Sequence, residues 1–302
     1  MRKLILAVIG VFLLSSMMAS AQRRPASTAS KTVVFAVLNE GKAIEPIGYI
    51  GAKGVMTPAI DGASEGPVIA AFHRTYFAKG KMFPLVFGGK VSGSVTVTSS
   101  NPRGECVNYL GNVTTKTTRS ALKGNIMALA TNAKIAEPGS GVRRLPTAAE
   151  RAEIETLVRD TYTKNSITAE IAKNLKYHNL TALDVNSDGQ AEMVGSFWVE
   201  PTATEREVLF FIAEMGADKK YRFGYSESRR IKQEETMSED IKDVDSGVYH
   251  ERLLDIFDIN GDGDSEVFSY VMSFEGAGFN VYKRQGESWV RHFEGSNYHC
   301  GY

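Results

Sequence analysis

The second half of the chain alternates short apolar runs with turns, in a pattern that occurs twice. Runs rich in β-branched and aromatic residues, which are typical of strands, are separated by clusters of Gly, Asp and Asn, which favour turns. The pattern predicts two sets of four strands, at residues 177–184, 191–200, 206–214, 220–228, 248–258, 265–274, 278–284 and 287–294. We therefore expect two blade-like β repeats, 177–228 and 248–294, each a four-stranded antiparallel unit.

The region before residue 137 is predicted to consist of short strands separated by glycine turns. One strand is expected over residues 32–38 and another over 126–130, and residues 82–98 are expected to form a hairpin that turns at Gly88-Gly89. Such a pattern is typical of a small β-barrel or a β-sandwich. Residues 22–136 are therefore predicted to form a basic β domain.

A Pro/Gly/Ser-rich linker over residues 137–146 separates this domain from a helical pattern. Thr147 and Glu150 have the spacing of a capping box, which marks the start of a helix. The apolar residues that follow recur at helical spacing, at Ile154, Leu157, Val158 and Tyr162. Residues 147–176 are expected to brace a sheet, so the fold class is mainly β with a short helical segment (α+β), the repeats lying within 177–302.

The first 21 residues have the features of a secretory signal peptide. Arg2 and Lys3 precede an apolar run over residues 4–14, and Ala19-Ser20-Ala21 resembles a cleavage site. The run is too short for a stable membrane span, and no later run approaches that length. We expect cleavage near Ala21-Gln22, a secreted or periplasmic product, and no transmembrane segment in the mature chain.

The formal net charge of zero conceals two halves of opposite sign. Residues 22–146 carry a net charge of +10 and residues 147–302 carry −12. One interpretation is that the halves attract each other and pack. The other is that the basic half meets an anionic surface, such as an envelope glycan, while the acidic half holds cations. We favour the first, because charge balance says more about solubility than about partners, and neither interpretation involves nucleic acid.

The two cysteines, Cys106 and Cys300, lie in different halves of the chain. In an oxidising compartment they could form a disulfide that ties the first half to the C-terminal tail. Two free or buried thiols are the alternative, because spacing alone does not fix the geometry.

The clearest candidate chemistry lies in two acidic segments that share the pattern D-x-N-x-D-G-x-x-E. We call residues 184–192 the first acidic loop and residues 258–266 the second acidic loop. Oxygen donors that alternate along a tightly turned loop suit a hard cation such as Ca²⁺, and glycine at the sixth position permits the sharp turn. The predicted ligands of two Ca²⁺ sites, with Gln190 and Asp264 offering backbone carbonyls, are Asp184, Asn186, Asp188, Gln190, Glu192, Asp258, Asn260, Asp262, Asp264 and Glu266.

A turn that binds no metal is the alternative for each loop taken singly, because Asp, Asn and Gly favour tight turns. Two copies in the same strand context favour the metal. An EF-hand does not fit, because its twelfth position would be Gly195 or Ser269 instead of glutamate, and strand-like residues flank both loops. The loops and their flanks, roughly residues 177–294, resemble the calcium loops of FG-GAP/VCBS repeats, which occur in integrin α-subunit propellers and secreted bacterial proteins.

The chain contains no H-E-x-x-H, no Walker-type Gly-rich loop and no C-x-x-C. Its five histidines are scattered and do not have metal-ligand spacing. We therefore expect a non-catalytic binding or cell-surface module whose partner is an envelope glycan or another surface protein. The alternative is a secreted hydrolase that uses Ca²⁺ for stability, with a catalytic pair that the sequence does not single out. A polar cleft between the halves that contains two carboxylates about 5–9 Å apart would favour this alternative. Room for only two repeats argues against a complete propeller, and leaves open how the two sheets pack.

Overall fold

A computed structural model describes residues 30–60, 66–103, 106, 109–117, 122–124, 126–135 and 143–300. By backbone contacts the chain divides into two units, Met1–Ser30 and Lys31–Tyr302, and the account below concerns the second. The predicted signal peptide and its cleavage site lie outside the described residues, as does most of the predicted linker. Within the described part, no helix is both long enough and apolar enough to cross a membrane.

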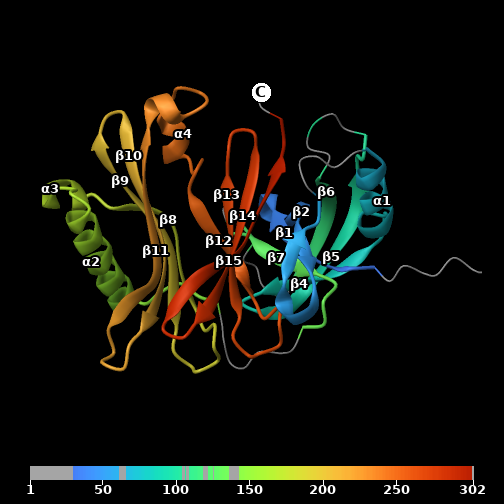
Figure 1. Ribbon diagram of the computed structural model, residues 1–302, viewed down its shortest axis with the longest axis horizontal. Coiled ribbons are helices and arrows are strands. Elements are labelled where there is room, and N and C mark those ends of the chain that lie inside the picture. Colours follow the sequence, from blue (N-terminus) through green and yellow to red (C-terminus); the bar gives the residue numbers. More distant parts are fainter. Residues whose placement is uncertain are drawn as a thin grey trace, which may run out of the picture. The chain divides into compact units, whose positions relative to one another are not determined.

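The first part of the chain forms a closed β-barrel, which decides between the barrel and the sandwich (Figure 1). The barrel order is β1-β7-β4-β5-β6-β2, and pairing of β2 with β1 closes it, while β3 extends the sheet from β2. Short 3₁₀ turns, η1 and η2, follow β1 and β2. The bounds are β1 Thr32–Leu38, η1 Asn39–Gly41, β2 Ala43–Ile50, η2 Ala52–Gly54, β3 Met56–Pro58, β4 Met82–Phe87, β5 Lys90–Ser100, β6 Gly111–Thr117 and β7 Ala128–Thr131.

The predicted hairpin is β4–β5, and it turns at Gly88-Gly89. Both glycines have positive φ, +66° and +72°, as a two-residue turn that follows the twist of the strands requires. At Gly88, an added Cβ would also lie 2.9 Å from the backbone nitrogen of Arg143. The turn therefore needs glycine both for its conformation and for its close contact with the segment that leaves the barrel.

One helix of the barrel region was not predicted. α1 (Gly66–Tyr76) packs Ile69, Phe72 and Tyr76 into the barrel core, where Phe35 also lies. These residues are spaced i, i+3 and i+7, so only a narrow apolar stripe marks the helix. The expectation of strands alone was wrong here, because small and polar residues separate the three apolar positions.

The second part of the chain forms the two predicted four-stranded antiparallel sheets. Sheet I has the order β11-β10-β9-β8 and sheet II the order β12-β13-β14-β15. Observed and predicted strands correspond one to one, which confirms two four-stranded antiparallel sheets. The bounds are β8 Lys176–Leu183, β9 Glu192–Thr202, β10 Glu205–Met215, β11 Tyr221–Lys232, β12 Glu251–Phe257, β13 Glu266–Met272, β14 Gly276–Gln285 and β15 Ser288–Tyr298. The segment from β11 to β12 contains η3 (Gln233–Glu235) and α4 (Lys242–Asp245).

The helices, the two sheets and the barrel form successive layers (Figure 1). α2 (Ala148–Lys164) and α3 (Ala169–Ala172) cover the outer face of sheet I, as the predicted brace requires. The predicted capping box is also present, since Thr147 Oγ1 accepts from Glu150 N and Glu150 Oε2 accepts from Thr147 N. Sheet I packs against sheet II, and sheet II packs against the barrel, so the repeats pack both on each other and on the first part of the chain.

Alternating side chains of single strands supply both faces of the inner layers. In β12, Leu253 and Ile256 face sheet I, whereas Leu254 and Phe257 face the barrel. β1 likewise has one face inside the barrel and the other against sheet II. Because side chains alternate across a strand, a strand buried on both faces must be apolar throughout, as the run over residues 33–38 is.

A buried ion pair connects the barrel, the end of the predicted linker and sheet II. Arg143 donates to Asp255 at 3.1 Å, and also to the carbonyls of Met127 and Leu254 at 2.8 and 2.7 Å. Both carboxylate oxygens of Asp255 accept from the backbone N–H of Gly88, at 2.9 and 3.0 Å. The Asp255 side chain is fully buried, so these contacts provide the donors that the carboxylate loses when water is excluded.

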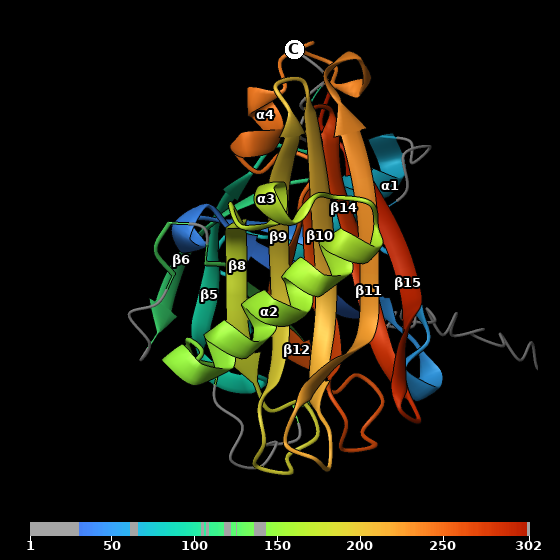
Figure 2. The same cartoon turned by 90° about the vertical axis from the view of Figure 1, so that its left-hand side faces the viewer.

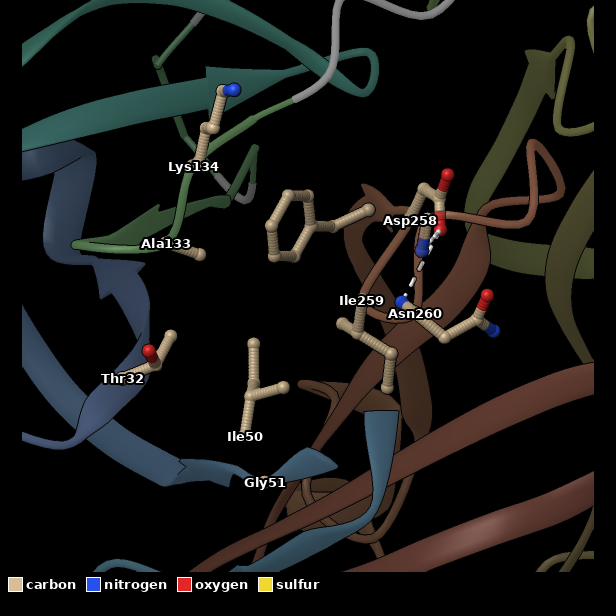
Figure 3. A pocket seen from close by; sticks show the side chains of 10 residues that line it. Thr32, Ile50, Gly51, Ala133, Lys134, Asp258, Ile259 and Asn260 are labelled. Atoms are coloured by element: carbon tan, nitrogen blue, oxygen red, sulfur yellow. Dashed lines mark hydrogen bonds between the residues drawn. The ribbon is translucent and has the colours of Figure 1, made fainter. Parts of the chain in front are cut away.

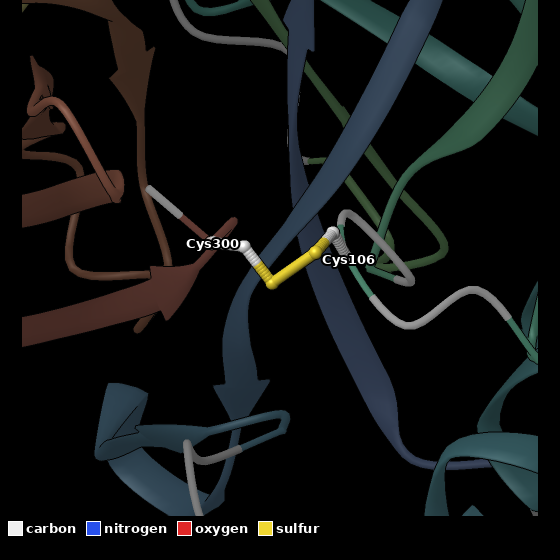
Figure 4. The surroundings of a disulfide bond; sticks show 2 residues. All are labelled: Cys106 and Cys300. Atoms are coloured by element: carbon white, nitrogen blue, oxygen red, sulfur yellow. A yellow bond between two sulfur atoms is a disulfide. The ribbon is translucent and has the colours of Figure 1, made fainter. Parts of the chain in front are cut away.

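The two cysteines form the disulfide that compartment arguments allowed. Cys106 and Cys300 are bonded with a Cα–Cα distance of 5.4 Å (Figure 4). The bridge joins the segment between β5 and β6 to the chain just beyond β15, so it closes a covalent loop around both sheets.

Candidate metal centres

The two acidic loops occupy equivalent places in the two sheets. The first acidic loop joins β8 to β9, and the second joins β12 to β13 (Figure 2). The loops are neighbours, because the Ser265 N–H donates to the Val185 carbonyl at 2.7 Å. The twelfth position of each motif lies inside a strand, at Gly195 in β9 and at Ser269 in β13. The prediction of a loop between strands is confirmed, and an EF-hand arrangement is excluded.

The same set of four hydrogen bonds shapes both loops. The carboxylate at the first position accepts from the N–H of the sixth residue, the amide oxygen at the third from the fifth, the carboxylate at the fifth from the seventh, and the glutamate at the ninth from the second. The four distances are 3.1, 3.1, 2.7 and 2.9 Å in the first loop and 3.0, 2.8, 3.0 and 2.9 Å in the second. Each loop therefore wraps its backbone around its own acidic side chains.

The backbone conformation repeats as well. Ser187 and Gly189, at the fourth and sixth positions of the first loop, have φ of +59° and +81°. Gly261 and Gly263, at the same positions of the second loop, have φ of +77° and +98°. Because side chains other than glycine rarely adopt positive φ, the glycine at the sixth position is a conformational requirement in both copies.

The first acidic loop gathers negative charge that the described side chains do not neutralise. Asp184 and Glu192 are 8 % and 3 % exposed, and Asp184 Oδ1 is buried without a hydrogen-bond partner in the part of the chain that the structure describes. Burial raises the pKa of Glu192 to about 8, and repulsion from Asp188 and Asp184 adds to this effect. The nearby Lys219 ammonium contacts the amide oxygen of Gln190, at 2.9 Å, instead of a carboxylate.

The second acidic loop has a lysine beside its carboxylates. Lys283 on β14 lies 3.1 Å from Asp262 and 3.8 Å from Glu266. Burial raises the pKa of Glu266 to about 7, although its hydrogen bond from the N–H of Ile259 and the charge of Lys283 oppose the rise. For Asp262, burial raises the pKa, but the hydrogen bonds from Lys283, the Asp264 N–H and Asn260, together with the charge of Lys283, outweigh burial and lower it. A positive charge is therefore stabilised where the motif predicts a cation.

The donors of both loops fit a hard cation in kind but are not gathered into a carboxylate cluster. No group of three or more His, Cys, Asp or Glu side chains in the described ranges is arranged to hold a metal ion. Ca²⁺ also accepts amide and backbone oxygens as ligands, and the motif supplies these at its third and seventh positions. The buried Asp184 oxygen without a partner and the Lys283 ammonium both indicate room for positive charge. All ten predicted ligands lie in the two loops or at the first residue of the following strand, five in each.

A pocket of about 310 Å³ adjoins the second acidic loop. Its walls come from the barrel, from the segment after β7 and from the loop, and Lys134 and Asp258 lie on opposite sides of it (Figure 3). Ile50 and Phe257 make part of the wall apolar, and Asn260 adds an amide. Asp258 is the one carboxylate among the residues that line this pocket, so the pocket does not contain the pair of carboxylates that would favour the hydrolase alternative.

The sequence motif did not indicate Lys283 as a neighbour of the second acidic loop, because Lys283 lies outside the loop, on β14. The pairing registers place it in sheet II where sheet I has Glu214, so comparison of the third strands of the two repeats would have revealed the difference. Among the aromatic residues of the repeats, Phe197, Phe211 and Phe268 are fully buried in the core.

Comparison of the chain with protein-family models, with curated proteins and with solved structures finds no significant match.

Proposed function

We propose that the protein is an exported, calcium-binding, non-catalytic interaction module with FG-GAP/VCBS-like repeats. The observation that carries the proposal is the hydrogen-bond scheme shared by the two acidic loops. Turn chemistry alone explains one loop that folds back on an aspartate. It does not explain why two loops 74 residues apart place buried glutamates at the same position, with the pKa of each raised.

Each bound cation would be held by the five side-chain and backbone donors already named in its loop. Its role would be structural: it would neutralise carboxylates that repel one another, and it would fix the first hairpin of each sheet. Because the loops contact each other through Ser265 and Val185, filling both sites would also stiffen the edge where sheets I and II meet.

The pocket beside the second acidic loop is the place that we propose for a ligand. It combines an ammonium at Lys134 with apolar surface at Ile50 and Phe257, and its volume is at the lower end of the usual range for small-molecule sites. An end group or side group of an envelope glycan or of a surface protein would fit such a site. Binding there would depend on calcium, because Asp258 and Asn260 belong to both the pocket and the loop.

Thermal unfolding with and without calcium tests the proposal. A cation that binds only the folded state stabilises it by about 2.7 kcal/mol per site at a free concentration of 100 times Kd. We expect a higher Tm in calcium than in EDTA, about half of the increase in Asp184→Asn or Asp258→Asn, and none in the double variant. Asp160→Asn is the matched control, because Asp160 is exposed on α2, away from both loops. Equal Tm in calcium and EDTA would contradict the proposal.

A further inference from the structure

A second polar cluster lies between the sheets, away from the acidic loops. His178 belongs to β8 of sheet I, while His250 immediately precedes β12 of sheet II and Arg252 lies within it. The two imidazole rings are 4.3 Å apart between centroids and meet edge to face. The turn after α4 covers the cluster, and an added Cβ at Gly247 would lie 3.5 Å from Arg252 Nη1 and 3.6 Å from His178 Cε1.

Four nitrogens of this cluster are buried without a hydrogen-bond partner among the described residues. His250 is 0 % exposed and neither of its ring nitrogens has a hydrogen-bond partner, and the same is true of His178 Nε2 and Arg252 Nε, within the described ranges. Arg252 is 7 % exposed, and no described carboxylate forms an ion pair with it. The Arg252 guanidinium lies over the face of the Tyr270 ring, 5.8 Å from its centroid, in a cation–π contact.

The nearest acceptors do not satisfy the cluster. The Val244 carbonyl lies near both imidazole rings, but it makes no well-formed hydrogen bond with the buried nitrogens named above. Asp245 is close enough to act on His178, yet its two oxygens are held by Arg206 at 2.5 and 3.0 Å. The cluster therefore has a fixed positive charge and N–H donors, and no carboxylate among the described residues balances that charge.

This arrangement favours an anion over a metal cation. An arginine keeps its charge at every pH of interest, and an uncompensated buried charge is strongly unfavourable. A cation beside Arg252 would be repelled, and two imidazoles are fewer ligands than a transition metal usually takes from a protein. The guanidinium presents parallel N–H donors whose geometry matches two oxygens of one anion, and a neutral imidazole can add a further N–H.

We propose that Arg252, His178 and His250 form a binding site for one small free oxyanion, of the carboxylate or sulfate type, between sheets I and II. Because His250 and Arg252 are buried, the ligand that we propose is a free ion or a small metabolite. Since His178 is in one sheet and the other two residues are at the edge of the next, the anion would join the two sheets. The site is independent of the proposed calcium sites.

Titration with sodium sulfate and, separately, with sodium acetate tests the site, with ionic strength held constant by sodium chloride, whose anion is not an oxyanion. We expect a saturable rise in the Tm of the wild-type protein with at least one of the two ions. Which ion is bound more tightly distinguishes an inorganic tetrahedral anion from a carboxylate. The rise should be absent in Arg252→Met and unchanged in Arg222→Met, a control in which an exposed arginine is removed. A rise of the same size in Arg252→Met would show an adventitious ion only and would overturn the proposal.

A measurement on the wild-type protein covers the case in which Arg252→Met does not fold. The imidazole NMR signals of His178 and His250 should shift saturably with the same ion and the same midpoint as Tm. The signal of His292, whose ring lies on a different strand near Gly54, should not move. Absence of any shift at His178 and His250 over the range in which Tm rises would overturn the proposal.

Discussion

Arg143→Met should lower the free energy of unfolding much more than the position of Arg143 next to a linker suggests. The substitution removes the guanidinium that bonds to Asp255 and to the carbonyls of Met127 and Leu254, and that stacks on the Phe87 ring at 4.6 Å. Asp255 would keep its backbone donors but would be left as a buried carboxylate without a counter-charge. Breaking a buried pair from one side costs about 3–5 kcal/mol.

The size of the effect can be set against an exposed pair in the same chain. Arg222 and Asp218 are 63 % and 46 % exposed and are joined at 2.6 Å, and such pairs contribute about 0–1 kcal/mol. Denaturant unfolding of Arg143→Met should therefore show a loss of about 4 kcal/mol, against less than about 1 kcal/mol for Arg222→Met. The double variant Arg143→Met/Asp255→Asn should lose less than the sum of its single variants, because neither charge is then left alone.

The loss should also depend on pH. Burial raises the pKa of Asp255, and the charge of Arg143 opposes that rise, so removal of Arg143 raises the pKa further. A carboxyl whose folded-state pKa is raised costs stability above the unfolded pKa, because folding must then retain a proton that the unfolded chain releases. The destabilisation by Arg143→Met should grow as pH rises from about 4 toward 7. A loss below about 1 kcal/mol, or additive single variants, would refute the view that this pair fastens the barrel to sheet II.

Three further predictions concern the tail and the second acidic loop. Replacing Cys106 and Cys300 by serine should lower the unfolding free energy by about 5 kcal/mol in denaturant titrations, since the bridge spans 194 residues; an unchanged midpoint would contradict this. Burial lowers the pKa of His299, but the hydrogen bond to Glu45 and its charge outweigh burial, so the net pKa is raised. The stability that this pair supplies should be complete below pH 6.5 and lost as pH rises through the raised pKa, and NMR titration of wild type and Glu45→Gln should give a lower pKa in the variant. Lys283→Met should tighten calcium binding at the second loop by about two- to fivefold in calorimetry, because the metal no longer displaces an ammonium; weaker binding would contradict this.

Local patterns were enough to predict the repeats. Strand spacing, glycine turns and the capping box at Thr147 depend on neighbouring residues, and all of these were confirmed. The narrow apolar stripe of α1 was a local signal that was missed. The order of the strands around the barrel could not be read in this way, because it depends on the long-range pairings of β1 with β7 and of β2 with β6.

The polar contacts between layers could not be predicted from the sequence either. Arg143 was assigned to a linker, and nothing in its neighbours indicates that it meets Asp255, 112 residues away. Within the candidate sites, the two loops and their strand context were predicted correctly from the motif. Lys283 lies on β14 of the same sheet, so its contact depends on strand pairing, whereas the cluster around Arg252 forms only where sheets I and II pack together.

The calcium content of the purified protein tests the central claim most directly. The protein would be freed of metal with EDTA, dialysed against a low, buffered concentration of Ca²⁺, and analysed for bound metal per chain. We expect two calcium ions per chain for the wild type, one for Asp184→Asn or Asp258→Asn, and none for the double variant. A wild-type protein that retains no calcium under conditions in which it is folded would contradict the account.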